Sequence, residues 1–241
     1  MHSGVRIPPP QPKTKIMRNK LFYFAIVPAL FFQLIGAYLY FVLFENEDFS
    51  QIIYFITKVA IVAWPLFWIV WVKSKFLPFL GGDLKKSLIL GVISGLCIVG
   101  IVSIAYFVLS DFLLQFVGNL ISATEGLNFL RHYVLFSFFL SVIHSFIEEY
   151  YWRWFVFNGL MLKFSKTTAV IISSLAFASH HFIVAMQFVP LYLAVIATIL
   201  IFFLGVFWTE LYLRTKNITG SWLSHFFADA IIMTIGYFLI F

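Results

Sequence analysis

Charged residues are scarce in this sequence, and their scarcity excludes most classes of soluble protein. Asp, Glu, Lys and Arg together make up 11% of the 241 residues, whereas a soluble domain averages about 25%. Cys97 is the only cysteine, which excludes a disulfide-stabilised scaffold. Because 62% of the residues are hydrophobic, intrinsic disorder of the whole chain is excluded as well.

Long apolar runs are abundant instead, and their length indicates membrane-spanning helices. Such a helix needs about 20 apolar residues, whereas a strand of a membrane barrel needs about 9–11 alternating ones. The runs here have the first length, so we expect an all-α bundle with about seven spans in a transmembrane domain at 21–241. Residues 1–20 are polar and rich in proline, and we expect them to form a disordered cytosolic tail. The predicted spans are 21–44, 52–72, 87–110, 134–162, 168–186, 191–213 and 220–241.

The basic residues predict the orientation of this domain. Lys and Arg collect in short cytoplasmic loops, and most of the 16 basic residues fall in the tail and in every second loop after it. We therefore expect the N-terminus inside and the C-terminus outside. Since these residues lie at membrane edges without interleaved aromatic side chains, we expect them to contact membrane lipids and not nucleic acid. They are Arg6, Lys13, Lys15, Arg18, Lys20, Lys73, Lys75, Lys85, Lys86, Lys163, Lys166, Arg214 and Lys216.

A small set of ionisable side chains lies inside the predicted spans. Each costs at least about 2.5–3.5 kcal/mol at bilayer depth, so each one indicates a function unless its position explains it. Position explains two of them. Lys58 is expected to extend outward to the membrane edge, and Glu210 is expected to pair with Arg214 one helical turn later. The others are His144, Glu148, Glu149, Arg153, His180, His181, His225 and Asp229.

The run at 134–162 carries two pairs at helical spacing. Positions four apart share a helix face, which pairs Glu149 with Arg153 and His144 with Glu148. The first pair neutralises itself, and helix packing alone accounts for it. Glu148 has no cation of its own, and packing does not account for it, so Glu148 is a candidate general base.

Two further runs supply histidines that can meet Glu148 near the middle of the membrane. His181 lies in the run at 168–186, and His225 lies four residues before Asp229 in the last run. A water molecule beside a Glu and a His forms a hydrolytic site in outline. A zinc ion held by Glu148, His181 and His225 would serve equally well, and the sequence leaves both options open.

These motifs, in this order, resemble those of the CPBP intramembrane proteases. That family includes type II CAAX prenyl endopeptidases, bacteriocin self-immunity proteins and abortive-infection proteins. The resemblance covers about 134–241, which corresponds to the core helices of the family. The motifs are Glu148-Glu149-x-x-x-Arg153, Phe177-x-x-x-His181 and His225-x-x-x-Asp229.

The resemblance implies a role for most of these residues. Glu148 and His181 would activate the attacking water, His225 and Asp229 would line the oxyanion side, and Glu149 with Arg153 would support the site. His180 has no counterpart with a role, and we expect it to support or pack against the site. Asp229 departs from the Asn usual in the prenyl endopeptidases. An ionised Asp cannot donate to an oxyanion, so it would be protonated, orient His225 or help to hold a metal.

The expected function is therefore hydrolysis of a peptide bond in a membrane-associated protein or peptide. The absence of long loops favours the plasma (inner) membrane of a bacterium, where we expect a substrate without a prenyl group. Two alternatives remain. A non-enzymatic immunity or partner-binding protein would need no general base, and a proton-coupled transporter would also bury Glu and His. Against a transporter, the sequence has no inverted repeat, and its buried charges gather in one site.

Overall fold

The computed structural model describes residues 19–44, 49–72, 79–118, 121–122 and 130–241, and nearly all of them are helical. No strand forms within these ranges apart from one isolated bridge between Leu80 and Asn217. The tail predicted at 1–20 lies outside the described residues except for its last two, so it stays a prediction.

Six helices in the described part of the chain are long and apolar enough to cross a membrane. They match six of the seven predicted runs and confirm an all-α, polytopic membrane bundle. The six are Phe22–Leu43, Ser50–Trp68, Leu84–Phe116, Lys166–Ala185, Leu191–Thr215 and Thr219–Ile240.

The seventh predicted run, at 134–162, is helical but is not among these six. It consists of successive helical segments from Tyr133 to Leu160, and it carries the buried charges that lower its hydropathy. Two of its segments are π-helical, and such wider turns occur frequently at functional sites. The segments are α6 (Tyr133–Phe138), η5 (Phe139–His144), α7 (Ser145–Glu149), η6 (Tyr150–Val156) and α8 (Phe157–Leu160).

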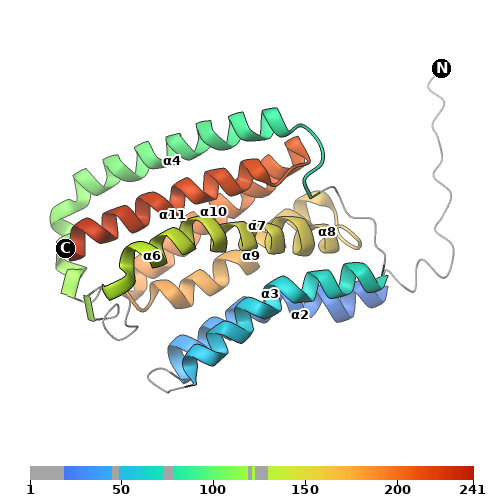
Figure 1. Ribbon diagram of the computed structural model, residues 1–241, viewed down its shortest axis with the longest axis horizontal. Helices are drawn as coiled ribbons and strands as arrows, with labels where there is room; N and C mark the ends of the chain where they lie inside the picture. Colours follow the sequence, from blue (N-terminus) through green and yellow to red (C-terminus); the bar gives the residue numbers. More distant parts are fainter. Residues whose placement is uncertain (1–18, 45–48, 73–78, 119–120, 123–129) are drawn as a thin grey trace.

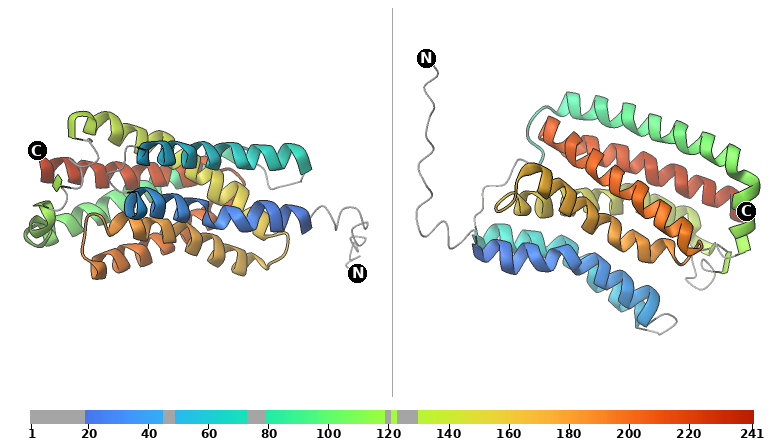
Figure 2. Two further views of the ribbon diagram at one scale, coloured as in Figure 1. Left: turned by 90° about the horizontal axis from the view of Figure 1, so that it is seen from below. Right: turned by 180° about the vertical axis from the view of Figure 1, so that it is seen from behind.

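The helices lie side by side along one direction (Figure 1). One edge of the bundle is α4, with α11 next to it, and the opposite edge is the pair of α2 and α3 (Figures 1 and 2). The segments α6 to α8, α9 and α10 lie between these edges. The remaining bounds are η1 (Leu21–Ile26), α2 (Val27–Tyr38), η2 (Leu39–Leu43), α3 (Ser50–Val72), α4 (Leu84–Leu113), η3 (Leu114–Phe116), η4 (Leu130–His132), α9 (Lys166–Ala185), α10 (Leu191–Thr215) and α11 (Thr219–Ile240).

Exposed apolar side chains cover the outside of the bundle, and the most tightly packed side chains lie in the segment from α7 to α8. Phe107 and Val134 are 76% and 70% exposed, as expected for residues that face lipid. Tyr151, Trp152 and Phe155, in contrast, are almost completely buried. The middle of the bundle therefore encloses the segment that carries the two glutamates.

The described basic residues of the predicted cytoplasmic loops gather at one end of the bundle. Contacts link these loops: Asp83 donates its backbone N–H to the carbonyl of Thr215, and Lys163 lies over the ring of Tyr23. Glu210 lies 3.0 Å from Lys166 Nζ. The expected pairing of Glu210 with Arg214 is therefore wrong, because α9 brings a closer cation to the carboxylate. Which side of the membrane this end faces stays a prediction.

Small residues allow α4 and α11 to approach closely. A Cβ atom at Gly91 would lie 2.6 Å from the carbonyl oxygen of Gly220, and a Cβ at Gly220 would lie 2.6 Å from the carbonyl oxygen of Ser87. The hydroxyl of Ser87 accepts from the Gly220 N–H at 2.8 Å and donates to the Asn217 carbonyl. Close packing and interhelical hydrogen bonds are the main attractions between helices in lipid. They fix α11, and therefore the residues it carries, relative to the rest of the bundle.

We expect Gly91→Val to destabilise the protein, because the added atoms meet backbone of α11 that cannot move aside. Overpacking of this kind costs about 1–3 kcal/mol. Gly100→Val on the same helix is the matched control, since a Cβ there meets nothing within 4 Å. Thermal unfolding of the two variants in detergent measures the difference. Equal midpoints would show that the α4–α11 contact does not limit stability.

Candidate active site

The structure brings all eight predicted site residues into one buried cluster. Three neighbouring stretches of chain supply them: the η5–α7–η6 segment, the middle of α9 and the first half of α11. Each of the eight side chains lies within 4.8 Å of another one in the set. The three pairs predicted from helical spacing are present, at 3.6 Å for His144–Glu148, 3.2 Å for Arg153–Glu149 and 3.6 Å for His225–Asp229.

Glu148 is at the centre of the cluster and is 2% exposed. One carboxylate oxygen, Oε1, accepts a hydrogen bond from His180 Nε2 at 3.1 Å. The same oxygen lies 2.9 Å from the amide nitrogen of Gln33, in the amide orientation that also lets Gln33 accept from Trp152 Nε1. The other oxygen, Oε2, lies 3.9 Å from His225 Nε2. One oxygen is thus held by donors, while the other faces a histidine at a distance too long for a direct hydrogen bond.

Glu149, the next residue along the same helix, binds two partners. Its Oε1 accepts from His225 Nδ1 at 3.0 Å, and its Oε2 lies 3.2 Å from Arg153 Nε. The guanidinium of Arg153 also stacks over the rings of Phe177 and Trp208, 4.3 and 5.3 Å from their centroids. Burial of this cation is therefore balanced by a carboxylate and by two aromatic faces.

The imidazole of His225 is held by two contacts, and its remaining nitrogen faces two carboxylates. Its Nδ1 is bound by Glu149, and its ring stacks on Trp208 with a centroid distance of 4.2 Å. Its Nε2 points toward Glu148 Oε2 at 3.9 Å and toward Asp229 Oδ1 at 3.6 Å. Polar atoms at such distances are commonly bridged by water. Because the Asp229 side chain is 29% exposed, this gap lies at a partly open edge of the cluster.

The two histidines of α9 approach Glu148 from the other direction. His180 bonds directly to Glu148, and its ring lies parallel to that of Trp152 with an interplanar angle of 5°. His181 bonds through Nδ1 to the carbonyl of Phe177 at 3.0 Å, which leaves its Nε2 available. His180, for which the motifs give no role, is thus the closer of the two to the carboxylate.

The residues on α9 also fit a zinc site. Ligand atoms of Glu148, His180 and His181 all lie within 4.8 Å of one another, and two histidines with one glutamate form a known zinc ligand set. The bond from His181 Nδ1 to a carbonyl is the outer contact typical of a metal-bound histidine. This set contains His180 where the sequence predicts His225, because His225 is held by Glu149. A zinc ion bound there would supply Lewis acidity to a bound water.

Two residues that the sequence analysis did not assign to the site belong to it. Gln33 on α2 is 3% exposed and contacts Glu148. Lys58 on α3 does not extend to the membrane edge as predicted, because its Nζ lies 3.3 Å from His144 Nε2. Gln33 carries no charge and so does not stand out among the ionisable residues, although an amide in an apolar run is itself a signal. The Lys58 side chain points inward because it contacts His144, which lies 86 residues away, and no local sequence pattern shows this contact.

A comparison with protein families finds a match over part of the chain. Residues 130–231 match the family model described as type II CAAX prenyl endopeptidase Rce1-like. No curated protein and no solved structure matches the chain. The matched segment contains all eight residues of the cluster and the three motifs that carry the resemblance. Residues 130–231 thus match the Rce1-like family of type II CAAX prenyl endopeptidases, in agreement with the resemblance that the motifs indicate.

Proposed function

We propose that the protein is an intramembrane endopeptidase that hydrolyses a peptide bond of a membrane-associated protein or peptide, with Glu148 as the general base. The observation that carries this proposal is the gap between Glu148 Oε2, His225 Nε2 and Asp229 Oδ1. A water molecule in this gap would lie beside a carboxylate able to take its proton. The coarser statement, an integral membrane protein with a domain of a protease family, rests on the family match and the six apolar helices.

The contacts support a division of roles within the cluster. Glu148 accepts the proton of the water, and His181, with its free Nε2, assists from α9. A protonated His225 has its Nδ1–H bound by Glu149, so its Nε2–H is free to donate to the oxyanion that forms on the substrate. Asp229 Oδ1 lies 3.6 Å from the same nitrogen, so its carboxylate can stabilise the charge of a protonated His225 without occupying the Nε2–H.

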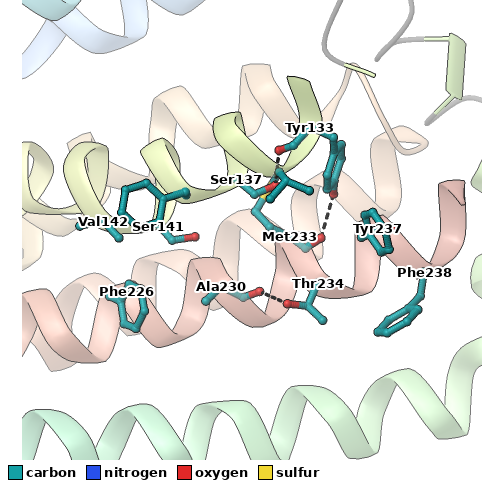
Figure 3. Close-up of a pocket in the computed structure, with 12 residues that line it drawn as sticks. Tyr133, Ser137, Ser141, Val142, Phe226, Ala230, Met233, Thr234, Tyr237 and Phe238 are labelled. Atoms are coloured by element: carbon teal, nitrogen blue, oxygen red, sulfur yellow. Dashed lines mark hydrogen bonds between the residues drawn. The ribbon is translucent and has the colours of Figure 1, made fainter. Parts of the chain in front are cut away.

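A groove beside the cluster is suited to an apolar part of the substrate. It has a volume of about 350 Å³ and lies between α11 and the α6–η5 segment (Figure 3). Ser141 lines it and is two helical turns from Glu148 on the same helix, and Ala230 lines it next to Asp229. A substrate segment lying in this groove would extend toward the open edge of the site. We place the protein in the plasma membrane of a bacterium, on the basis of its short loops.

Lys58 is best interpreted as a positioning residue. Its ammonium group lies over the Tyr54 ring, 5.0 Å from the centroid, and donates to His144 Nε2. That same nitrogen lies 3.6 Å from Glu148 Oε1. Lys58 thus holds His144 in place beside Glu148 and acts on the carboxylate only through this histidine, whereas Arg153 pairs with Glu149 directly.

Replacement of Glu148 by Gln is expected to reduce cleavage at least about 100-fold, because it preserves shape and removes the proton acceptor. The control is Glu210→Gln, which makes the same change at the membrane edge. New protein termini in cells that express each form, identified by mass spectrometry, measure cleavage. If Glu148→Gln gives the same termini as the wild type, the proteolytic role of Glu148 is wrong. If the variant also retains a protective or partner-binding phenotype, a non-enzymatic immunity protein is favoured.

Glu149→Gln is expected to act mainly on stability. It leaves the Arg153 guanidinium, 1% exposed, without its counter-charge, and breaking a buried pair costs about 3–5 kcal/mol. Glu210→Gln breaks an exposed pair and should cost no more than about 1 kcal/mol. Thermal unfolding in detergent compares the two, and a Glu149 variant as stable as the Glu210 variant would contradict the structural role of Glu149.

Lys58→Met should lower kcat about tenfold or more with little change in KM, since a hydrogen bond from a charged group contributes about 1.5–3 kcal/mol. Lys166→Met, at the membrane edge, is the control. The assay uses a peptide substrate identified by the mass-spectrometric mapping of new protein termini. A rise in KM at constant kcat would show instead that Lys58 binds the substrate.

A further inference from the structure

A second groove lies between α4 and α10, away from the catalytic cluster. Its volume is about 500 Å³, and none of the eight site residues lines it. Apolar residues of both helices form most of its walls, among them Ile93, Ile98, Leu204 and Phe207. Seen from behind, α10 leaves the basic end close to the start of α4 and then crosses the bundle diagonally, so the two helices diverge (Figure 2). The groove is thus an apolar furrow that begins at the basic end.

The length of the furrow corresponds to one leaflet of a bilayer. Its lining on α10 extends from Arg214 to Leu204, which at about 1.5 Å per residue is about 15 Å. The hydrocarbon core of a bilayer is about 30 Å thick, so each leaflet contributes about 15 Å. An occupant with a head at Arg214 would therefore have its tail within one leaflet.

The polar groups of the furrow are segregated by depth. In its deeper part the hydroxyl of Ser94 donates to the carbonyl of Leu90 at 2.7 Å, so it offers no free donor to an occupant. The thiol of Cys97 behaves as a small apolar group. The two charged residues, Glu210 and Arg214, lie together at the basic end. The furrow thus has one charged end and one apolar channel.

The charge left at that end is positive. The carboxylate of Glu210 is bound by Lys166 at 3.0 Å. Within the described ranges, no carboxylate lies within ion-pair distance of the exposed Arg214. Lys85 and Lys86 begin α4 at the same end and are exposed as well. An occupant with an anionic head is therefore favoured.

We propose that the furrow between α4 and α10 binds an anionic glycerophospholipid. The phosphate is held by Arg214, and one acyl chain lies along Ile93 and Ile98 of α4 and Leu204 and Phe207 of α10. A guanidinium matches a phosphate with two parallel hydrogen bonds, which distinguishes it from a general attraction to the membrane surface.

Photocrosslinking in nanodiscs tests this site. The probes are phosphatidylglycerol and phosphatidylcholine with the same diazirine-bearing acyl chain, and mass spectrometry maps the labelled residues on full-length protein. We expect labelling at 90–98 and 204–211 to be at least threefold higher with phosphatidylglycerol. Arg214→Gln should remove this preference, whereas Arg131→Gln, an exposed arginine outside the furrow, should preserve it. Cys97→Phe should reduce labelling by both lipids, because the larger side chain fills the channel.

Three outcomes would overturn the proposal. They are equal labelling by the two lipids, a preference that survives Arg214→Gln, and labelling spread evenly around α4 in the wild type. Labelling does not depend on proteolysis, so the failure of the lipid proposal can be distinguished from the failure of the proposed function.

Discussion

The cost of burying charge in an apolar bundle is the constraint on which the rest of the structure depends. Glu149 and Arg153 are both almost completely buried, and neither could be so alone, because an unpaired charge at this depth costs several kcal/mol. Their pairing determines which face of the helix points inward. It also leaves Glu149 Oε1 available to bind His225, so α11 is attached to the same ion pair. The histidine at the site is therefore oriented by a contact that stability requires in any case.

Glu148 is also buried, but among the described residues it is accommodated without an ion pair to Lys or Arg. No arginine or lysine lies within ion-pair distance of it in the part of the chain that the structure describes. Uncharged donors hold it instead: His180 and, in its favoured orientation, Gln33. A carboxylate in such surroundings is solvated by the protein without being neutralised. Two adjacent glutamates on one helix thus acquire opposite properties, since one is tied into a pair and the other is left able to accept a proton.

Local spacing accounts for the part of this arrangement that could be predicted from sequence. The pairs at positions 144/148, 149/153 and 225/229 follow from the helical period, and the helical type of the spans and six of the seven predicted runs follow from run length. What could not be predicted depends on contacts between distant segments. Lys58 turns inward because α3 packs near His144, and Glu210 pairs with Lys166 because α9 begins next to the end of α10. The π-helical turns of η5 and η6 also leave no sequence signal, although they flank the two glutamates.

The close approach of α4 to α11 affects both the basic end and the middle of the bundle. Lipid provides no hydrophobic force between helices, so the position of α11 depends on contacts as short as those of Gly91 and Gly220. At the basic end this contact brings α4 and the end of α10 together. Toward the middle, the same helix α11 carries His225 to Glu149. Because one rigid helix has both contacts, a substituent that shifts α11 by a fraction of an ångström at Gly220 would also move His225 relative to Glu148. The gap of 3.9 Å between those two side chains is therefore set partly by packing at a glycine outside the site.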